Sequence, residues 1–243
     1  MTTEDKMARR PTWAEIDLDA LARNLNAIRA EVGPEVSVMA AVKADAYGHG
    51  AAACARRLES ESVDWFGVAM PEEGIELREA GIGKPILCLG GFWPGQELAC
   101  LRQRLTLVVY RRDMIEALDR AARVAGLLAN IHVKIDTGMG RLGVRCDEVG
   151  QFCDALSQHQ SVRVDGLMTH LAAADDPAHE DFTNDQLKRF QQAVNLFRER
   201  GFAPTYVHAA NSAAAFAYPQ ARGNMVRPGG ALFSPPGPRT DPR

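Results

Sequence analysis

The chain has 243 residues, of which 46% are hydrophobic and 24% charged, and its formal net charge is -3. The hydrophobic content is typical of a globular protein with a sizeable core, and the balance of charge excludes the basic footprint of a nucleic-acid or membrane-surface protein. The N-terminus mixes charges of both signs, and no apolar run approaches the length, about 20 residues, that spans a bilayer. The five cysteines form no CxxC pair, which indicates reduced thiols. We therefore expect a soluble, cytoplasmic protein.

Short apolar runs, most of them followed by a helical pattern, predict strands that are covered on both faces, as in a parallel sheet. In chain order these runs cover residues 36–42, 65–69, 85–89, 105–110, 130–135, 162–169, 205–209 and 224–226. About eight strands alternating with helices fit an α/β fold of the (β/α)8 TIM-barrel type. A doubly wound sheet is the competing interpretation, because the same alternation serves both folds. We expect one barrel domain over residues 1–233.

Helix signals lie between these strands. Asp19 is a candidate N-cap for a helix that Gly33 ends, and Thr183 predicts the start of a longer helix that ends at Gly201. Residues 234–243 contain four prolines and a glycine, which cannot extend a helix or a central strand. We expect them to form an unstructured tail.

Polar residues gather where the predicted strands end, which is the edge where α/β barrels carry their sites. Lys43 follows the first strand in AVKADAYGHG, and Lys134, His170, His208 and Arg227 accompany the ends of later strands. A lysine that is rooted in apolar surroundings can act as a nucleophile or a base. An isolated lysine at such a place more often extends its ammonium group into solvent.

Two stretches predict an anion site. In ANSAAA, Asn211 and Ser212 precede a helix whose first N–H groups lack partners, and in RPGG, Gly229 and Gly230 allow a close approach to backbone N–H groups. The alternative is structural, with Ser212 as a helix cap and the glycines as a tight turn. Taken together, the two stretches favour a phosphate cup. A phosphate cup beside Lys43 is what pyridoxal 5′-phosphate (PLP) requires.

A metal site is a weaker interpretation of the same strand ends. His132, His170 and His208 do not follow the HExxH spacing, and no carboxylate shares a tight motif with them. The stretch around Lys43 also lacks the GxxxxGK order of a P-loop. We therefore expect no metal, and we expect any inward-facing histidine to orient other groups by hydrogen bonds.

The chain resembles the alanine racemases. AVKADAYGHGA is similar to their PLP-attachment motif, and KIDTGMGRLG, MTHLAAAD, HAANSAAA and VRPGGAL match further segments in order. The resemblance runs from about residue 11 to residue 232. It implies a PLP-binding barrel that interconverts L-alanine and D-alanine, a peptidoglycan precursor, by removing and returning the proton at Cα.

The resemblance also implies roles for single residues. Lys43 would link to the cofactor as a Schiff base and act as one of two opposed acid–base groups. Tyr47 would reach the cofactor phosphate, within a cup that includes Asn211, Ser212, Gly229 and Gly230. Arg141 would contact the substrate carboxylate, and Lys134, at a position that is carbamylated in some members, would support that arginine.

His170 would, by the same resemblance, hydrogen-bond Arg227, the arginine expected at the pyridine nitrogen of the cofactor. Many PLP enzymes place a carboxylate there, which keeps the nitrogen protonated and the ring a strong electron sink. Arginine cannot accept that proton, so the nitrogen would stay neutral. A weaker electron sink disfavours transamination and other side reactions.

Racemisation needs a base on each face of Cα, and the family's second base is a tyrosine of a C-terminal β-domain that reaches across a homodimer interface. None of Tyr47, Tyr110, Tyr206 and Tyr218 matches that tyrosine. We therefore expect the barrel of an alanine racemase without its second domain. Alone, it should have poor racemase activity. The sequence does not decide its oligomeric state, because the family's homodimer depends on that second domain. The alternatives are a single-domain PLP-binding protein without racemase activity and a PLP decarboxylase or aldolase. KIDTGMGR and Arg227 argue against the last of these.

Overall fold

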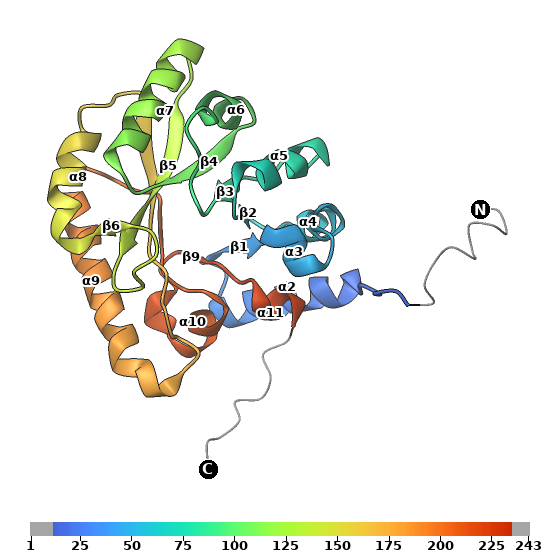
Figure 1. Ribbon diagram of the computed structural model, residues 1–243. Helices are drawn as coiled ribbons and strands as arrows, with labels where there is room; N and C mark the ends of the chain where they lie inside the picture. The colour runs from blue at the N-terminus through green and yellow to red at the C-terminus, as the bar shows by residue number, and fades with distance from the viewer. Residues whose placement is uncertain (1–11, 235–243) are drawn as a thin grey trace.

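The structure, a computed structural model, describes residues 12–234. Eight parallel strands form a barrel, and helices surround it (Figure 1). The expected barrel is confirmed, and the doubly wound alternative is wrong. The strands are β1 (Ser37–Ala41), β2 (Trp65–Val68), β3 (Ile86–Cys88), β4 (Leu105–Val109), β5 (Ala129–Asp136), β7 (Val162–Met168), β8 (Tyr206–His208) and β9 (Met225–Val226), while β6 (Val144–Arg145) pairs with the end of β5 outside this order. The expected tail lies, after Ser234, outside the described residues.

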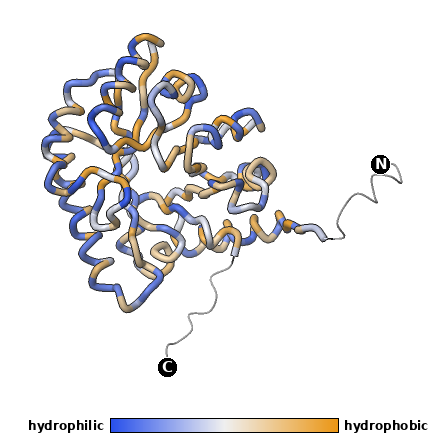
Figure 2. The backbone as a smooth tube through the Cα atoms, in the orientation of Figure 1, coloured by the Kyte–Doolittle hydropathy of each residue, from blue (hydrophilic) through white to orange (hydrophobic). Residues whose placement is uncertain are grey.

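Helices connect the strands and form the outer layer, where Figure 2 shows many hydrophilic residues. They are α2 (Leu18–Val32), α3 (Lys43–Gly48), α4 (Ala51–Ser60), α5 (Pro71–Glu79), α6 (Glu97–Arg102), α7 (Arg112–Ala125), α8 (Val149–Leu156), α9 (Glu180–Glu199), α10 (Ser212–Ala217) and α11 (Gly230–Phe233), with short 3-10 turns η1 (Cys146–Glu148), η2 (Pro177–His179) and η3 (Pro219–Ala221). None of the helices within the described part of the chain is long and apolar enough to cross a membrane.

The ring of strands closes between β8 and β9. The Asn224 N–H donates to the Val207 carbonyl at 3.3 Å, and the Arg227 N–H donates to the Ala210 carbonyl at 3.0 Å. On its other side, β9 pairs with β1 in parallel. The end of β9 is therefore held on both sides, and Arg227 follows it directly.

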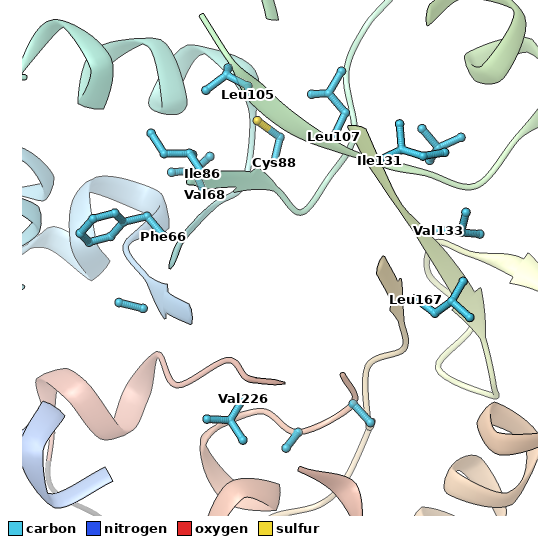
Figure 3. Close-up of a cluster of buried hydrophobic side chains, with 14 of the residues drawn as sticks. Phe66, Val68, Ile86, Cys88, Leu105, Leu107, Ile131, Val133, Leu167 and Val226 are labelled. Carbon is cyan, nitrogen blue, oxygen red and sulfur yellow. The ribbon is translucent and has the colours of Figure 1, made fainter. Parts of the chain in front are cut away.

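Side chains alternate along each strand between the helices and the barrel interior. The outward face packs against the helices, as Figure 3 shows for Phe66, Val68, Ile86, Cys88, Leu105, Leu107, Ile131, Val133, Leu167 and Val226. The inward face forms a separate cluster of Met39, Trp65, Leu87, Val108, Met168 and Met225. Continuing the inward alternation to the strand ends reaches Lys43, Lys134, His170 and Arg227. Because side chains alternate with a period of two residues, these four side chains lie together at one mouth of the barrel.

Two expected helix starts are wrong. Asp17, rather than Asp19, caps α2, because its Oδ1 accepts the Ala20 N–H at 2.9 Å. Asp19 lies in the first turn, where a negative charge still favours the helix dipole. Helix α9 begins at Glu180, so Thr183 is an interior residue, and its side chain is fully buried. The start of α9 is shifted because η2 leads directly into it.

Asp119 of α7 lies buried against the segment that leads into β7. Its carboxylate accepts the Ser161 N–H at 3.1 Å and lies 3.3 Å from His159 Nδ1 and 3.2 Å from Arg123 Nε. Burial raises the pKa of Asp119, but these hydrogen bonds and the Arg123 charge outweigh it and lower that pKa below its usual value. The ionised carboxylate therefore ties α7 to the segment before β7.

We predict that Asp119→Ala lowers the free energy of unfolding by about 1–3 kcal/mol, because it leaves the Ser161 N–H without its acceptor. Urea denaturation at neutral pH measures the loss. Asp113→Ala is the matched control on the same helix, since Asp113 is exposed and its replacement should change stability by less than about 0.5 kcal/mol. Equal effects of the two substitutions would contradict this account of Asp119.

Candidate functional site

A cavity of about 510 Å³ opens at the carboxyl ends of the strands. Its size is within the usual range for small-ligand sites. The ten residues to which the resemblance assigns a role line it, namely Lys43, Tyr47, Lys134, Arg141, His170, Asn211, Ser212, Arg227, Gly229 and Gly230. His132 and His208 do not line it. A second cavity, of about 590 Å³, lies between α6 and α7 on the outside of the barrel, and none of these residues lines it. The chemistry suggested by the sequence is therefore concentrated in the first cavity.

Lys43 begins an unusual segment of backbone. The four residues after it, Ala44, Asp45, Ala46 and Tyr47, have positive φ angles between 50° and 56°, so α3 contains a left-handed turn. The left-handed conformation costs about 1–2 kcal/mol for each residue that is not glycine. Such strain persists only where the surroundings hold it. The sequence did not predict this turn, because no glycine marks these four positions.

Tyr47 and the RPGG turn meet at one end of the cavity. A Cβ atom at Gly229 would overlap the Tyr47 hydroxyl, so this close approach requires glycine. The Ser212 Oγ accepts the Gly229 N–H at 2.9 Å and the Ala231 N–H at 3.1 Å. Two hydroxyl groups and a turn of backbone N–H groups thus lie together, which is the chemistry that binds phosphate.

Asn211 is the cap of α10. Its Oδ1 accepts the Ala214 N–H at 3.0 Å, while Ser212 directs its hydroxyl to the RPGG turn. The alternative in which Ser212 caps the helix is therefore wrong. The cap role falls to Asn211, and Ser212 remains available to the cavity.

Arg227 is a buried cation at the base of the cavity. Its Nη1 lies 2.8 Å from His208 Nδ1, and its Nη2 donates to the carbonyls of Thr169 at 2.7 Å and Ala209 at 3.0 Å. Because arginine only donates, His208 Nδ1 must accept, which leaves the His208 proton on Nε2. That proton points to His132 Nδ1 at 2.8 Å. The arginine therefore fixes the tautomer of both histidines.

The expected hydrogen bond between His170 and Arg227 is not the one that the structure forms, since the histidine partner of Arg227 is His208. His170 instead lines the cavity. The sequence predicted that any inward-facing histidine among His132, His170 and His208 would orient other groups by hydrogen bonds. His132 and His208 form such hydrogen bonds, whereas His170 forms none from its side chain to the described residues. Gly166 makes room for the pair, because a Cβ there would come within 2.6 Å of the His132 ring.

Gln186 of α9 is a buried residue that sequence reasoning missed. Its Nε2 donates to Thr137 Oγ1 at 3.1 Å and to the His170 carbonyl at 3.3 Å, and its Oε1 accepts the Ala172 N–H at 2.9 Å. One amide therefore joins the segment after β5 to the segment after β7. The sequence carried no signal for it beyond a polar residue in an amphipathic helix.

The cavity has an excess of positive charge. Four cations line it, Lys43, Lys134, Arg141 and Arg227, against one carboxylate in its lining, Asp175. Burial, followed by the charges of Arg141 and Arg227, lowers the pKa of Lys134 to about 8, and burial lowers the pKa of Arg227 to about 10. The cavity therefore favours an anion. Asp175 was missed, although it closes the quoted stretch MTHLAAAD.

We predict that the buried histidines make the fold sensitive to acid. Burial and the Arg227 charge lower the pKa of His132 and of His170 to about 3, and that of His208 well below its usual value. The unfolded chain binds protons at these residues near pH 6.5, so it takes up more protons than the folded chain at lower pH. Stability should therefore fall as the pH falls below about 6.5, by up to about 1.4 kcal/mol per pH unit for each histidine.

The urea midpoint between pH 5 and pH 8 measures this effect. The variant His170→Asn should lose stability less steeply than the parent below about pH 6.5, and the two should run in parallel above it. Identical slopes over the whole range would contradict the prediction for His170.

Comparisons with known proteins agree with this geometry. Residues 16–235 match the family model described as "Alanine racemase, N-terminal domain". The alanine racemase of Citrifermentans bemidjiense is 43% identical over 231 residues, which cover 93% of this chain and 61% of that protein. That of Geobacter sulfurreducens is 43% identical over 229 residues, covering 93% and 60%.

Solved structures give the same result. The alanine racemase of Clostridium difficile 630 in complex with cycloserine superposes with a TM-score of 0.89 at 37% identity, over 92% of this chain and 62% of that one. The alanine racemase of Bacillus anthracis with bound L-Ala-P gives 0.87 at 31% identity, over 93% and 58%. The chain thus spans about 60% of the length of the relatives it matches. This chain belongs to the alanine racemase family, and the part that matches is the family's N-terminal barrel domain.

Proposed function

We propose that this chain binds PLP through Lys43 and supplies one half of the acid–base machinery of an alanine racemase. The observation that carries the proposal is the convergence of a lysine, a phosphate-binding turn and a buried arginine on one cavity. The match to alanine racemases supports PLP as the cofactor and alanine as the substrate. This chain spans only part of the length of its relatives. The racemase activity of the whole enzyme and its assembly as a homodimer are therefore also proposals.

The phosphate end of the cavity fits the cofactor. The Ser212 hydroxyl and, at the RPGG turn, the Gly230 N–H would donate to the phosphate, together with the Tyr47 hydroxyl and, in the same lining, Asn211. The Gly229 N–H donates to Ser212 Oγ and so directs that hydroxyl. Partial burial raises the pKa of Tyr47, so its hydroxyl remains a donor at neutral pH. The glycine required beside Tyr47 supports this assignment, since a side chain there would fill the cup.

The ring end of the cavity fits a neutral pyridine nitrogen. The three hydrogen bonds of Arg227 to other described residues use three of its five N–H groups, so two can face a ligand. Arginine donates to a ring nitrogen and does not protonate it. When bound, PLP supplies an electron-withdrawing ring that acidifies the Cα–H of an attached amino acid.

Lys43 would hold and move the proton on one face of Cα, and His170 lines the wall beside it. Arg141 lies exposed at the cavity rim, where it would bind the substrate carboxylate. Lys134 would support it. With its pKa lowered to about 8, Lys134 has a reactive neutral fraction near neutral pH that can add carbon dioxide and release a proton, giving an anionic carbamate beside Arg141.

The opposite face of Cα lacks a tyrosine among the described residues. Tyr47 lines the cavity at its phosphate end, whereas Tyr110 donates to the Gly90 carbonyl and Tyr206 packs on Trp65 in the barrel interior. Tyr218 is buried elsewhere. This arrangement favours slow racemisation by the chain alone. It also supports the second candidate function, a PLP-binding protein without racemase activity.

We predict that Lys43→Ala abolishes covalent PLP binding. The parent should become coloured with PLP, and reduction with sodium borohydride should fix the cofactor to the Lys43 peptide, as detected by mass spectrometry. Lys188→Ala is the control, because Lys188 is exposed on α9. A Lys43→Ala protein that is as coloured as the parent would refute the role of Lys43.

We also predict that the chain, loaded with PLP in D₂O, exchanges the α-proton of L-alanine faster than it forms D-alanine. Lys43 can remove and return the proton on one face, while the other face has no tyrosine from the described residues. Mass spectrometry measures deuterium at Cα, and chiral chromatography measures D-alanine. Rapid formation of D-alanine would refute the prediction that the chain lacks an effective second base.

A further inference from the structure

Glu73 of α5 joins two strand ends at the cavity. One carboxylate oxygen, Oε1, accepts the Ala44 N–H at 2.7 Å. The other, Oε2, accepts the Ala69 N–H at 2.5 Å and the Met70 N–H at 3.3 Å. The second oxygen thus serves the start of its own helix, whereas the first reaches the amide that directly follows Lys43.

The helix that carries Glu73 packs closely against the barrel. Glu73 lies in the first turn of α5, where the helix dipole favours a carboxylate. The next residue, Gly74, packs so closely on β4 that a Cβ would approach the Leu105 side chain to 3.0 Å. Helix α5 therefore packs directly against the barrel at the residue next to Glu73.

The left-handed turn after Lys43 needs such an external hold. Ala46 is buried and Tyr47 packs on Phe233, but Ala44 and Asp45 are exposed, so packing contributes little to the strained conformation of the first two residues. Contacts within the segment exist, such as the Ala51 N–H to Asp45 Oδ1 at 2.6 Å. Glu73 adds a charged acceptor from another helix, at the first strained residue.

We propose that Glu73 is a positioning residue for Lys43. Its carboxylate binds the Ala44 amide, keeps the left-handed turn folded, and so directs the lysine amine into the cavity. The inference rests on the proposed function of Lys43, but it concerns a residue outside the cavity lining. A carboxylate that only capped α5 would make no difference to Ala44.

The test uses the full chain with Glu73→Ala, Ala44→Gly, both substitutions together, and Glu72→Gln as the matched control. Glu72 is exposed on the same turn of α5 and accepts a hydrogen bond from Gln96. Hydrogen exchange over residues 44–50 is measured without cofactor. The Kd for PLP and the yield of borohydride-fixed cofactor on Lys43 are measured in parallel.

We expect Glu73→Ala to speed hydrogen exchange over residues 44–50 and to weaken PLP binding by about 10- to 100-fold. This fold-change corresponds to the loss of one hydrogen bond to a charged acceptor. Ala44→Gly should restore much of both in the double variant, because glycine adopts a positive φ without steric cost. Glu72→Gln should match the parent. Should Glu73→Ala not fold, Glu73→Gln takes its place, since its amide keeps one acceptor and presents N–H groups to the other contacts.

Two results would overturn the proposal. One is unchanged exchange and PLP affinity in Glu73→Ala while the parent binds PLP. The other is a loss that Ala44→Gly does not relieve, which would mean that Glu73 acts only as a helix cap. If the parent itself fails to fix PLP on Lys43, the proposed function falls, and the exchange measurement still decides whether Glu73 holds the turn.

Discussion

The buried guanidinium of Arg227 is the constraint to which the rest of the site conforms. Removing a charge from water is costly unless its donors are satisfied, and three of the donors of Arg227 bind groups at the carboxyl ends of β7 and β8. These contacts lie where the barrel closes. The hydrogen bonds that satisfy the Arg227 charge therefore form together with the closure of the barrel. The protonation of the two neighbouring neutral histidines is determined in the same way. Arg227 sets the tautomer of His208 and, through His208, that of His132.

Much of the fold was predictable because its signals are local. Each barrel strand is an apolar run bounded by a helix signal, and the carboxyl ends of parallel strands must share one edge. The inward alternation then decides which polar residues meet. Lys43 and Arg227 are 184 positions apart in the sequence, yet each follows an inward-facing series at the end of a strand. Such residues could be grouped into one site without knowledge of any distance.

Other features depend on contacts between distant segments and left no trace in the sequence. The left-handed turn has no glycine, and its contact with Glu73 follows from the place of α5 beside α3. Which histidine bonds Arg227 depends on which ring lies beside it, and that ring is His208. Gly166 provides the space for His132, which His208 contacts in turn. The cap of α2 was missed by two residues because two aspartates compete and only geometry separates them.

The charge excess of the cavity has a consequence for handling the protein. The site is lined by Lys43, Lys134, Arg141 and Arg227, with Asp175 as the carboxylate in its lining, and it should therefore bind different anions in competition with one another. Inorganic phosphate and sulfate would occupy the same N–H and hydroxyl donors as a phosphorylated ligand and compete with it. An affinity measured in phosphate buffer would then report an exchange of anions rather than a binding constant. The choice of buffer anion, together with its concentration, is thus part of any statement about how tightly this barrel holds its ligand.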